Sequence, residues 1–256
     1  MTGLIHATGL HAELGGSLVL KNADLLLDQG QFLAVIGPNG AGKSSLLRAV
    51  LRLLPIQSGR IEICGQDVSG LAPQKLSHFL SYIPQGHIAH WPLDVETLVA
   101  LGRRQKHHVF EKLRDEDHDA IEKALRAVGL QAFRKRPLST LSGGEKARAF
   151  IARALASQAR ILMVDEPVAA LDPRHQLQVM GLLKDLCSDH DIGVVSVLHE
   201  LHLATRYCDA FLLVNEGMTQ LIGYGELPSN VDTIERVFGI KVQNLPQGGY
   251  GAVGFR

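Results

Sequence analysis

Eight consecutive residues near the start of the chain, 37–44, have the types and the spacing needed to hold phosphate groups. They match the pattern G-x-x-x-x-G-K-[ST] at each required position. An apolar run (32–36) precedes them and a helix-forming run (45–51) follows, so they lie where a strand turns into a helix. Glycine lets backbone N–H groups turn inward around phosphate oxygens, and the helix adds the positive end of its dipole. The predicted phosphate-binding residues are Gly37, Pro38, Asn39, Gly40, Ala41, Gly42, Lys43, Ser44 and Ser45.

Lys43 and Ser44 give this loop its chemistry. The Lys43 ammonium is a mobile charge suited to the β- and γ-phosphates of ATP, and the Ser44 hydroxyl is a hard oxygen ligand suited to Mg²⁺. The plainer alternative is a glycine-rich loop of an unrelated α/β protein, which the flanking strand and helix patterns disfavour. The loop therefore predicts a nucleotide site, with ATP and Mg²⁺ as its ligands, but no particular activity.

A second segment, 161–167, is a run of four apolar residues that leads into Asp165 and Glu166. Such a run is typical of a central strand in a parallel sheet, which is covered on both faces. Asp165 would then hold Mg²⁺ through water, and Glu166 would polarise the water that attacks the γ-phosphate. Alone, the segment would be interpreted as a strand capped by two solvated acids. With Lys43 in the same chain, the catalytic interpretation is favoured.

A third segment, Ser142-Gly143-Gly144-Glu145, opens a helix-forming run (146–156) and offers a second helix N-terminus suited to phosphate. One compact site has little use for two such N-termini. The simplest explanation is that this one serves the nucleotide held by another subunit. The sequence therefore predicts a dimer with shared sites.

Leu141 to Glu145 resembles the signature sequence of the ATP-binding-cassette (ABC) ATPases, which usually ends in glutamine. Glu145 departs from that pattern, and the departure bears on nucleotide affinity rather than on the assignment. Three more positions match the family in the right order. The resemblance implies that Gln85 is a hinge residue that ligates Mg²⁺ and water. It also implies that Asp172 lies in a loop that crosses the dimer interface, and that His199 is the switch histidine that contacts the γ-phosphate.

The resemblance covers about residues 3–225 and implies an α/β fold: a P-loop NTPase (RecA-like) core with an antiparallel β layer and an inserted ABC-type helical subdomain. Short apolar runs without intervening helices favour antiparallel strands near the N-terminus, including two separate strands at 18–20 and 23–27. Apolar residues at three- and four-residue spacing then favour helices, including one at 117–128. We expect a single domain, 1–256, with its core at 1–85 and 157–256 and its helical subdomain at 86–156.

One feature of the family is missing. ABC ATPases usually stack an aromatic ring on adenine, and the family pattern places Leu14 at that position, with His11 close by. Leucine packs against a base but offers no π-face. Two explanations stay open: weaker packing of adenine on Leu14, or a His11 that takes the place of the aromatic ring.

Composition and charge exclude several classes of protein. The 26 basic and 26 acidic residues cancel, which is not the charge balance of a nucleic-acid-binding protein. Two basic patches, 103–106 and 134–136, are expected to be solvated surface. Histidines within 87–90 and 107–108 are interpreted as polar loop residues rather than as a metal site. No apolar run approaches the roughly 20 residues that cross a bilayer, and no signal-peptide pattern is present, so a cytoplasmic protein is expected.

Three functions from different classes fit such a chain: the ATPase subunit of a membrane transporter, a soluble ABC ATPase of DNA repair or translation, and an ordinary P-loop kinase. A kinase has no use for the 141–145 segment. A DNA-repair ATPase of this class needs a long heptad coiled coil between Lys43 and Ser142, which the sequence lacks. A translation factor of this class usually carries two cassettes in one chain. The transporter ATPase is therefore the favoured function.

Two stretches, 91–103 and 199–209, resemble importer ATPases for ferric siderophores, haem and vitamin B12. That resemblance implies an ATP-hydrolysing homodimer on the cytoplasmic face of the inner membrane. Separate transmembrane permease subunits would bind it, and a substrate-binding protein would serve it indirectly. The groove beside Gln85, with residues 86–92, is expected to push on a permease helix. Another transported substrate stays open as an alternative, because substrate choice belongs to the other subunits.

Overall fold

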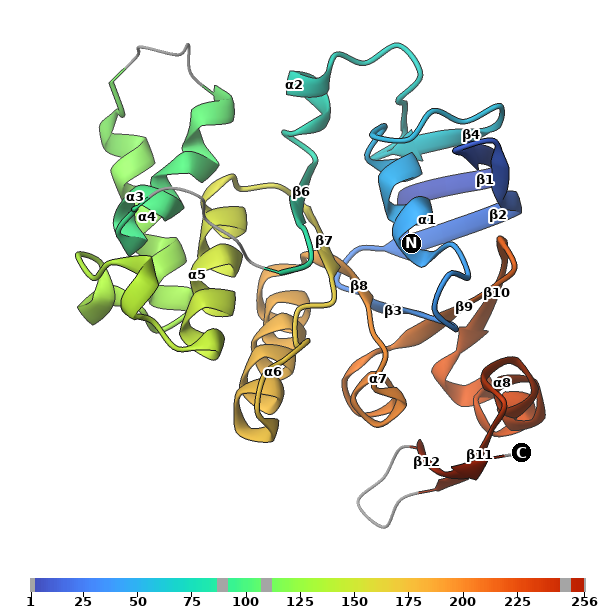
Figure 1. Ribbon diagram of the computed structural model, residues 1–256. Helices are drawn as coiled ribbons and strands as arrows, with labels where there is room; N and C mark the ends of the chain where they lie inside the picture. Colours follow the sequence, from blue (N-terminus) through green and yellow to red (C-terminus); the bar gives the residue numbers. More distant parts are fainter. Residues whose placement is uncertain (1–2, 87–91, 107–111, 245–249, 256) are drawn as a thin grey trace. The chain divides into compact units, whose positions relative to one another are not determined.

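The computed structural model describes residues 3–86, 92–106, 112–244 and 250–255 of the 256-residue chain (Figure 1). The chain divides into a first unit, Met1–Leu71 with Lys184–Arg256, and a second unit, Ala72–Leu183. The predicted helical subdomain, 86–156, has other bounds than either unit and stays a prediction. No helix within the described ranges is both long and apolar enough to cross a membrane.

The first unit contains an antiparallel sheet of β1 (Gly3–Leu14), β2 (Ser17–Asp28), β4 (Ser58–Ile63) and β5 (Gln66–Asp67). The strand order is β2-β1-β4-β5, which confirms the predicted antiparallel layer. From Ala23 to Leu27, buried and exposed residues alternate in β2, as expected for a strand with one face on the core. The prediction of two strands in this stretch is wrong. Asn22 adopts a left-handed φ of 57°, and the strand continues through it.

A second group of strands in this unit consists of β3 (Phe32–Ile36), β8 (Gly193–Val197), β9 (Ala210–Asn215) and β10 (Met218–Gly223). β3 lies between β8 and β9, parallel to both, and β10 is antiparallel to β9. All residues of β3 and β8 are buried, which explains why both are mainly apolar. Val35 pairs with Val197, so the chain leaves β3 and β8 at the same edge of the sheet. That edge carries the 37–44 loop and His199.

The remaining elements of the first unit are α1 (Lys43–Val50), α7 (Leu201–Tyr207), η4 (Tyr224–Glu226), η5 (Pro228–Asn230), α8 (Val231–Phe238), β11 (Ile240–Asn244) and β12 (Tyr250–Phe255). α1 begins directly after Gly42, two residues before the start of the predicted helix (45–51), and buries Leu46 and Leu47. β11 and β12 form a hairpin, and the Tyr250 N–H donates a 2.9 Å hydrogen bond to the Thr205 hydroxyl of α7. The hairpin is thereby tied to the helix that follows His199.

The second unit combines two parallel strands with a group of helices (Figure 1). Its elements are α2 (Pro73–Leu76), β6 (Leu80–Ile83), α3 (Val95–Ala100), η1 (Leu101–Lys106), α4 (Asp115–Ala127), η2 (Gln131–Phe133), η3 (Leu138–Thr140), α5 (Gly143–Ala156) and β7 (Ile161–Asp165). α3 and α4 both pack on α5. α4 buries Ala120, Ile121, Ala124 and Leu125, the three- and four-residue spacing from which this helix was predicted. α6 (Pro173–His190) begins in this unit and reaches the first.

Candidate functional site

The 37–44 loop has the backbone conformation that its glycines predict. Gly37, Gly40 and Gly42 have positive φ, at 152°, 77° and 108°. A Cβ atom on Gly42 would lie 2.7 Å from the carbonyl oxygen of Val19, closer than real side chains approach. Backbone conformation and close packing therefore both require glycine at this position.

The N-terminus of α1 is suited to an anion. Among the described residues no side chain caps it, and its first turn contains no acidic residue. Backbone N–H groups in a first helical turn have no acceptor within the helix, and the dipole makes that end positive. Lys43 is 6% exposed, and its Nζ donates hydrogen bonds of 2.8 Å to the carbonyl oxygens of Gly37 and Pro38. The ammonium thus lies inside the loop, and Ser44 follows it in the helix end that attracts phosphate.

His199 directly follows Leu198, at the end of β8. The Leu198 N–H donates a 3.1 Å hydrogen bond to the Val35 carbonyl, which holds this segment against β3. The His199 side chain is exposed. The structure therefore brings His199 to the sheet edge from which the phosphate loop also leaves.

The second unit holds the acidic pair and the predicted hinge glutamine. Ile83 of β6 pairs with Val164 of β7, so Gln85 and Glu166 follow the ends of neighbouring parallel strands. Gln85 Nε2 donates a 2.6 Å hydrogen bond to Glu166 Oε2. Glu166 has a φ of 54°, a left-handed conformation that costs free energy for a residue with a side chain and marks a candidate functional position.

The donor atoms of the predicted metal ligands fit Mg²⁺. Asp165 ends β7, is 3% exposed, and has the Tyr82 hydroxyl 3.5 Å from its Oδ2. A cation offsets the cost of burying a carboxylate so deeply. The Asp165 carboxylate, the Ser44 hydroxyl and the Gln85 carbonyl are hard oxygen donors of the kind that Mg²⁺ binds.

Ser142 and Glu145 cap α5 reciprocally. Ser142 Oγ accepts a hydrogen bond from the Glu145 N–H at 3.2 Å, and Glu145 Oε2 accepts one from the Ser142 N–H at 2.8 Å. The Ser142 N–H lowers the pKa of the Glu145 carboxyl, which is charged at neutral pH. Glu145, which stands in place of the family's usual glutamine, thus serves as the N3 residue of a capping box, a position that glutamine can also fill. The S-x-x-E spacing was the signal from which the sequence could have revealed it.

Asp172 makes two contacts with His175, a residue that sequence reasoning missed. Asp172 Oδ1 accepts a hydrogen bond from the His175 N–H at 3.0 Å, and its Oδ2 lies 2.5 Å from His175 Nδ1. The backbone N–H of His175, and after it the ring, lowers the pKa of the Asp172 carboxyl. Asp172 therefore serves the start of α6 in its own chain. An aspartate at a helix start was the available signal.

The two candidates for adenine packing differ in their surroundings. Leu14 ends β1 and is 51% exposed. His11 Nδ1 lies 3.1 Å from the Gly9 carbonyl oxygen and 3.0 Å from Ser58 Oγ, which fixes the ring on the β1–β4 pair. Leu14 is the more available of the two, and the adenine contact stays a prediction.

Two expectations fall on residues that the structure does not describe. The histidines of 87–90 and 107–108 lie outside the described ranges, as do residues 87–91 of the expected permease contact. Within the described ranges, no group of three or more histidine, cysteine, aspartate and glutamate residues could hold a metal ion.

Comparison with known proteins identifies the family of this chain. The family model described as ABC transporter matches residues 20–169, more than half of the chain. The chain belongs to the ABC transporter family. The family predicted from the sequence is confirmed, and so is the fold class. A dimeric bacterial ABC transporter cassette is 25% identical with a TM-score of 0.74, and the match covers 86% of this chain and 98% of that one.

Relatives of this ABC protein are named as ATP-binding proteins of transport systems. It is 38% identical to a hemin import ATP-binding protein of Streptomyces coelicolor, over 98% of this chain and 88% of the relative. It is 33% identical to the ferric enterobactin transport ATP-binding protein of Escherichia coli, over 89% of this chain and 84% of the relative. A cobalamin import ATP-binding protein of Halobacterium salinarum is 35% identical over 93% of this chain. The chain spans 59% of that relative's length.

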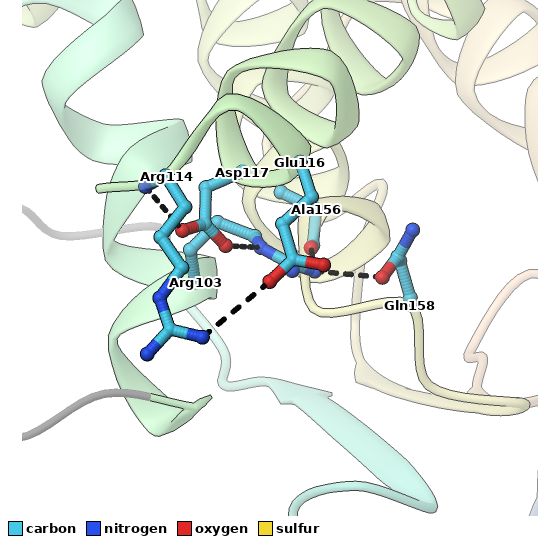
Figure 2. Close-up of polar contacts among 6 residues, drawn as sticks. All are labelled: Arg103, Arg114, Glu116, Asp117, Ala156 and Gln158. Carbon is cyan, nitrogen blue, oxygen red and sulfur yellow. Dashed lines mark hydrogen bonds and ion pairs between the residues drawn. The ribbon is translucent and has the colours of Figure 1, made fainter.

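The signature helix α5 of this ABC protein ends against a buried ion pair (Figure 2). Arg103 Nε donates to Asp117 Oδ1 at 2.7 Å, and the two residues are 2% and 0% exposed. Arg103 Nη1 also donates to the Ala156 carbonyl at 2.9 Å and to Gln158 Oε1 at 2.8 Å. The expectation that the 103–106 patch is solvated surface is wrong for Arg103. Its guanidinium neutralises Asp117 and satisfies the last carbonyl of α5.

Proposed function

We propose that this chain is the ATP-hydrolysing subunit of an ABC importer for an iron chelate, haem or a cobalamin-type substrate. The phosphate loop, in which the ammonium of Lys43 is buried beside the N-terminus of α1, carries the ATP-binding part of the proposal. The ABC transporter family match over residues 20–169 supports the transporter part. The hemin, enterobactin and cobalamin systems named for its relatives support the substrate range.

The loop and the acidic pair have complementary roles in this proposal. The loop N–H groups and Lys43 bind the β- and γ-phosphates, and Lys43 exchanges the Gly37 and Pro38 carbonyls for charged phosphate oxygens. Glu166 polarises the attacking water, and the 2.6 Å hydrogen bond from Gln85 orients its carboxylate.

Three further roles complete the assignment. His199 contacts the γ-phosphate. Ser44, Gln85 and Asp165 hold Mg²⁺, which when bound neutralises charge on the phosphates. Leu14 packs against adenine in preference to His11, because His11 is already engaged with Ser58.

The signature turn acts on a second copy of the chain. Ser142 caps α5, and the Gly143 and Gly144 amides lie in its first turn, where backbone N–H groups have no acceptor within the helix. In a head-to-tail dimer with two-fold symmetry, these groups close on the ATP held by the loop of the other copy, with Asp172 near the interface. The related bacterial cassette is dimeric, which supports the formation of a dimer.

The ATPase dimer is peripheral to the membrane in this proposal, on its cytoplasmic face. Separate transmembrane permease subunits bind it, and a substrate-binding protein delivers the substrate to them. Gln85 acts as a hinge, so closure on ATP moves the helical subdomain and the 86–92 contact with the permease. ATP binding is thereby converted into a change of permease conformation.

A mixing experiment tests hydrolysis and the shared site together. Lys43→Ala impairs the subunit's own loop, and Ser142→Arg blocks the helix end that the subunit donates. Each variant alone is expected to lose nearly all ATPase activity. A mixed dimer keeps one site made of two intact halves, so activity should return on mixing. Absence of recovery, with both variants folded and dimeric by size-exclusion chromatography, would contradict the proposal.

A further inference from the structure

A histidine outside the predicted motifs packs against the signature turn. His175 lies in the first turn of α6, and Gly144 is the second residue of α5. A Cβ atom on Gly144 would lie 2.7 Å from His175 Cγ and 2.9 Å from His175 Cβ. Real Cβ atoms do not approach so closely. The imidazole therefore fills the space that a side chain at position 144 would need, and Gly144 is buried beneath it.

The same imidazole is held by the carboxylate of Asp172. Oδ2 of Asp172 lies 2.5 Å from His175 Nδ1, and Oδ1 accepts from the His175 backbone N–H at 3.0 Å. A carboxylate at Nδ1 requires a proton on that nitrogen, which sets both the tautomer and the orientation of the ring. The ring is thus fixed at its Nδ1 edge by Asp172, while its Cδ2–Cγ edge covers Gly144.

Leu171 makes a matching contact with the other glycine. A Cβ atom on Gly143 would lie 2.9 Å from Leu171 Cδ2. The two signature glycines therefore face one side chain each from the segment 171–175. Because both contacts are close-packed, a displacement of this segment displaces the start of α5 with it.

We infer that His175 is a positioning residue that ties the Asp172 loop to the Gly143–Gly144 amides of its own chain. It thereby sets where those amides stand when they meet the ATP of the other subunit. The inference rests on the proposed function for the existence of that shared site. It also gives Gly144 a steric reason to be glycine that is separate from the approach of phosphate.

Three substitutions on α6 separate the hydrogen bond from the bulk of the ring. His175→Leu keeps bulk but removes the bond to Asp172. We expect its kcat for ATP hydrolysis to fall about 10- to 100-fold, because a misplacement of about 1 Å can cost up to about 100-fold in rate. His175→Asn offers an amide donor near the Nδ1 position and should recover most of the activity. His190→Leu, at an exposed position near the end of the same helix, should equal the parent.

Subunit mixing then shows whether the defect of His175→Leu lies in the phosphate loop of its own subunit or in the signature turn that this subunit donates. If His175 positions the donated amides, His175→Leu should regain activity when mixed with Lys43→Ala, because one fully intact site forms. It should not regain activity when mixed with Ser142→Arg, because both sites then lack an intact signature turn. A general folding defect would not distinguish these two mixtures.

A steric test uses Gly144 itself. Gly144→Ala should lower kcat strongly in the parent and less in the His175→Gly background, where the atoms that the new methyl group meets are gone. Equal losses in both backgrounds, or parental activity of His175→Leu, would overturn the inference. If Lys43→Ala and Ser142→Arg still complement each other in that case, the proposed function stands. If that pair fails to complement, the shared site and the inference fail together.

Discussion

The two ends of helix α5 are held by opposite means. At its C-terminal end, Arg103 and Asp117 form an ion pair that is almost fully buried, and the same guanidinium binds the carbonyl of Ala156 (Figure 2). At its N-terminal end, Ser142 and Glu145 close a capping box near the surface. The glycines that follow Ser142 place no side chains of their own over the backbone N–H groups.

The contacts at these two ends contribute unequally to the stability of the fold, because only those at the C-terminal end are buried. Loss of one partner from a buried ion pair costs about 3–5 kcal/mol, whereas loss of an N-cap side chain costs about 0.5–2 kcal/mol. The stronger anchor therefore lies at the end away from the proposed ligand, where the ion pair joins η1 to α4 and Arg103 binds α5 through the Ala156 carbonyl. At the N-terminal end, the Gly143 and Gly144 N–H groups can bind phosphate without loss of the contacts that hold the C-terminal end.

Removal of the anchor should have the largest effect on stability. Arg103→Met leaves the Asp117 carboxylate buried without its guanidinium, although the Arg114 N–H still donates to it at 2.8 Å. We expect the free energy of unfolding in urea to fall by about 3–5 kcal/mol. The double variant Arg103→Met/Asp117→Leu should recover most of that loss, because it removes both charges.

An exposed arginine on the same group of helices provides the control. The Arg126 side chain of α4 is 72% exposed, and its Nη2 lies 3.9 Å from Glu122 Oε1, which is a long distance for an ion pair. Arg126→Met should therefore change the unfolding free energy by less than about 0.5 kcal/mol. An Arg103→Met variant as stable as Arg126→Met would show that the buried pair is not the anchor.

Removal of the Ser142 cap should have a smaller effect on stability than removal of Arg103. Ser142→Ala deletes the hydroxyl that accepts from the Glu145 N–H, and the unfolding free energy should fall by about 0.5–2 kcal/mol. Ser142→Thr keeps a hydroxyl and should lose less. The contrast between the two ends would disappear if Ser142→Ala destabilised the protein as much as Arg103→Met.

The charge of Glu145 should have the smallest effect, visible as a dependence on pH. The Ser142 N–H lowers the pKa of Glu145 from its ordinary value of 4.5, so the unfolded chain binds this proton more readily. The charged carboxylate therefore stabilises the fold above pH 4.5, and that contribution is lost as the pH falls through the lower folded-state pKa. Urea unfolding of the parent and of Glu145→Gln, from neutral to acidic pH, should show the parent's advantage shrinking with acidity. An advantage that grows with acidity would contradict this assignment.

Features that depend on residues adjacent in the chain were largely predictable from the sequence. The phosphate loop is one, because its glycine conformations and the start of α1 depend on adjacent residues. The buried strands β3 and β7 are others, because a strand covered on both faces needs an apolar run. The division of β2 into two strands failed for a local reason: Asn22 tolerates a left-handed φ without ending the strand.

The role of Arg103 could not be predicted, because a run of basic residues is the same in sequence whether its members are solvated or buried. Only packing places Asp117, 14 residues away, against that guanidinium. His175 is a second case. Its spacing from Asp172 is local, but its contact with Gly144 joins two helices that are distant in the chain.

The sequence by itself determined the family, from motifs spread over about residues 37–199. It also determined the phosphate loop with Lys43 and the helix start at Ser142, since both depend on neighbouring residues whose types restrict the backbone directly. Tertiary structure alone decided which charges are buried and which side chain covers Gly144. The reason is physical. Burial and close packing arise between elements that the chain connects only through long intervening segments, and no local pattern specifies which faces of those elements will meet.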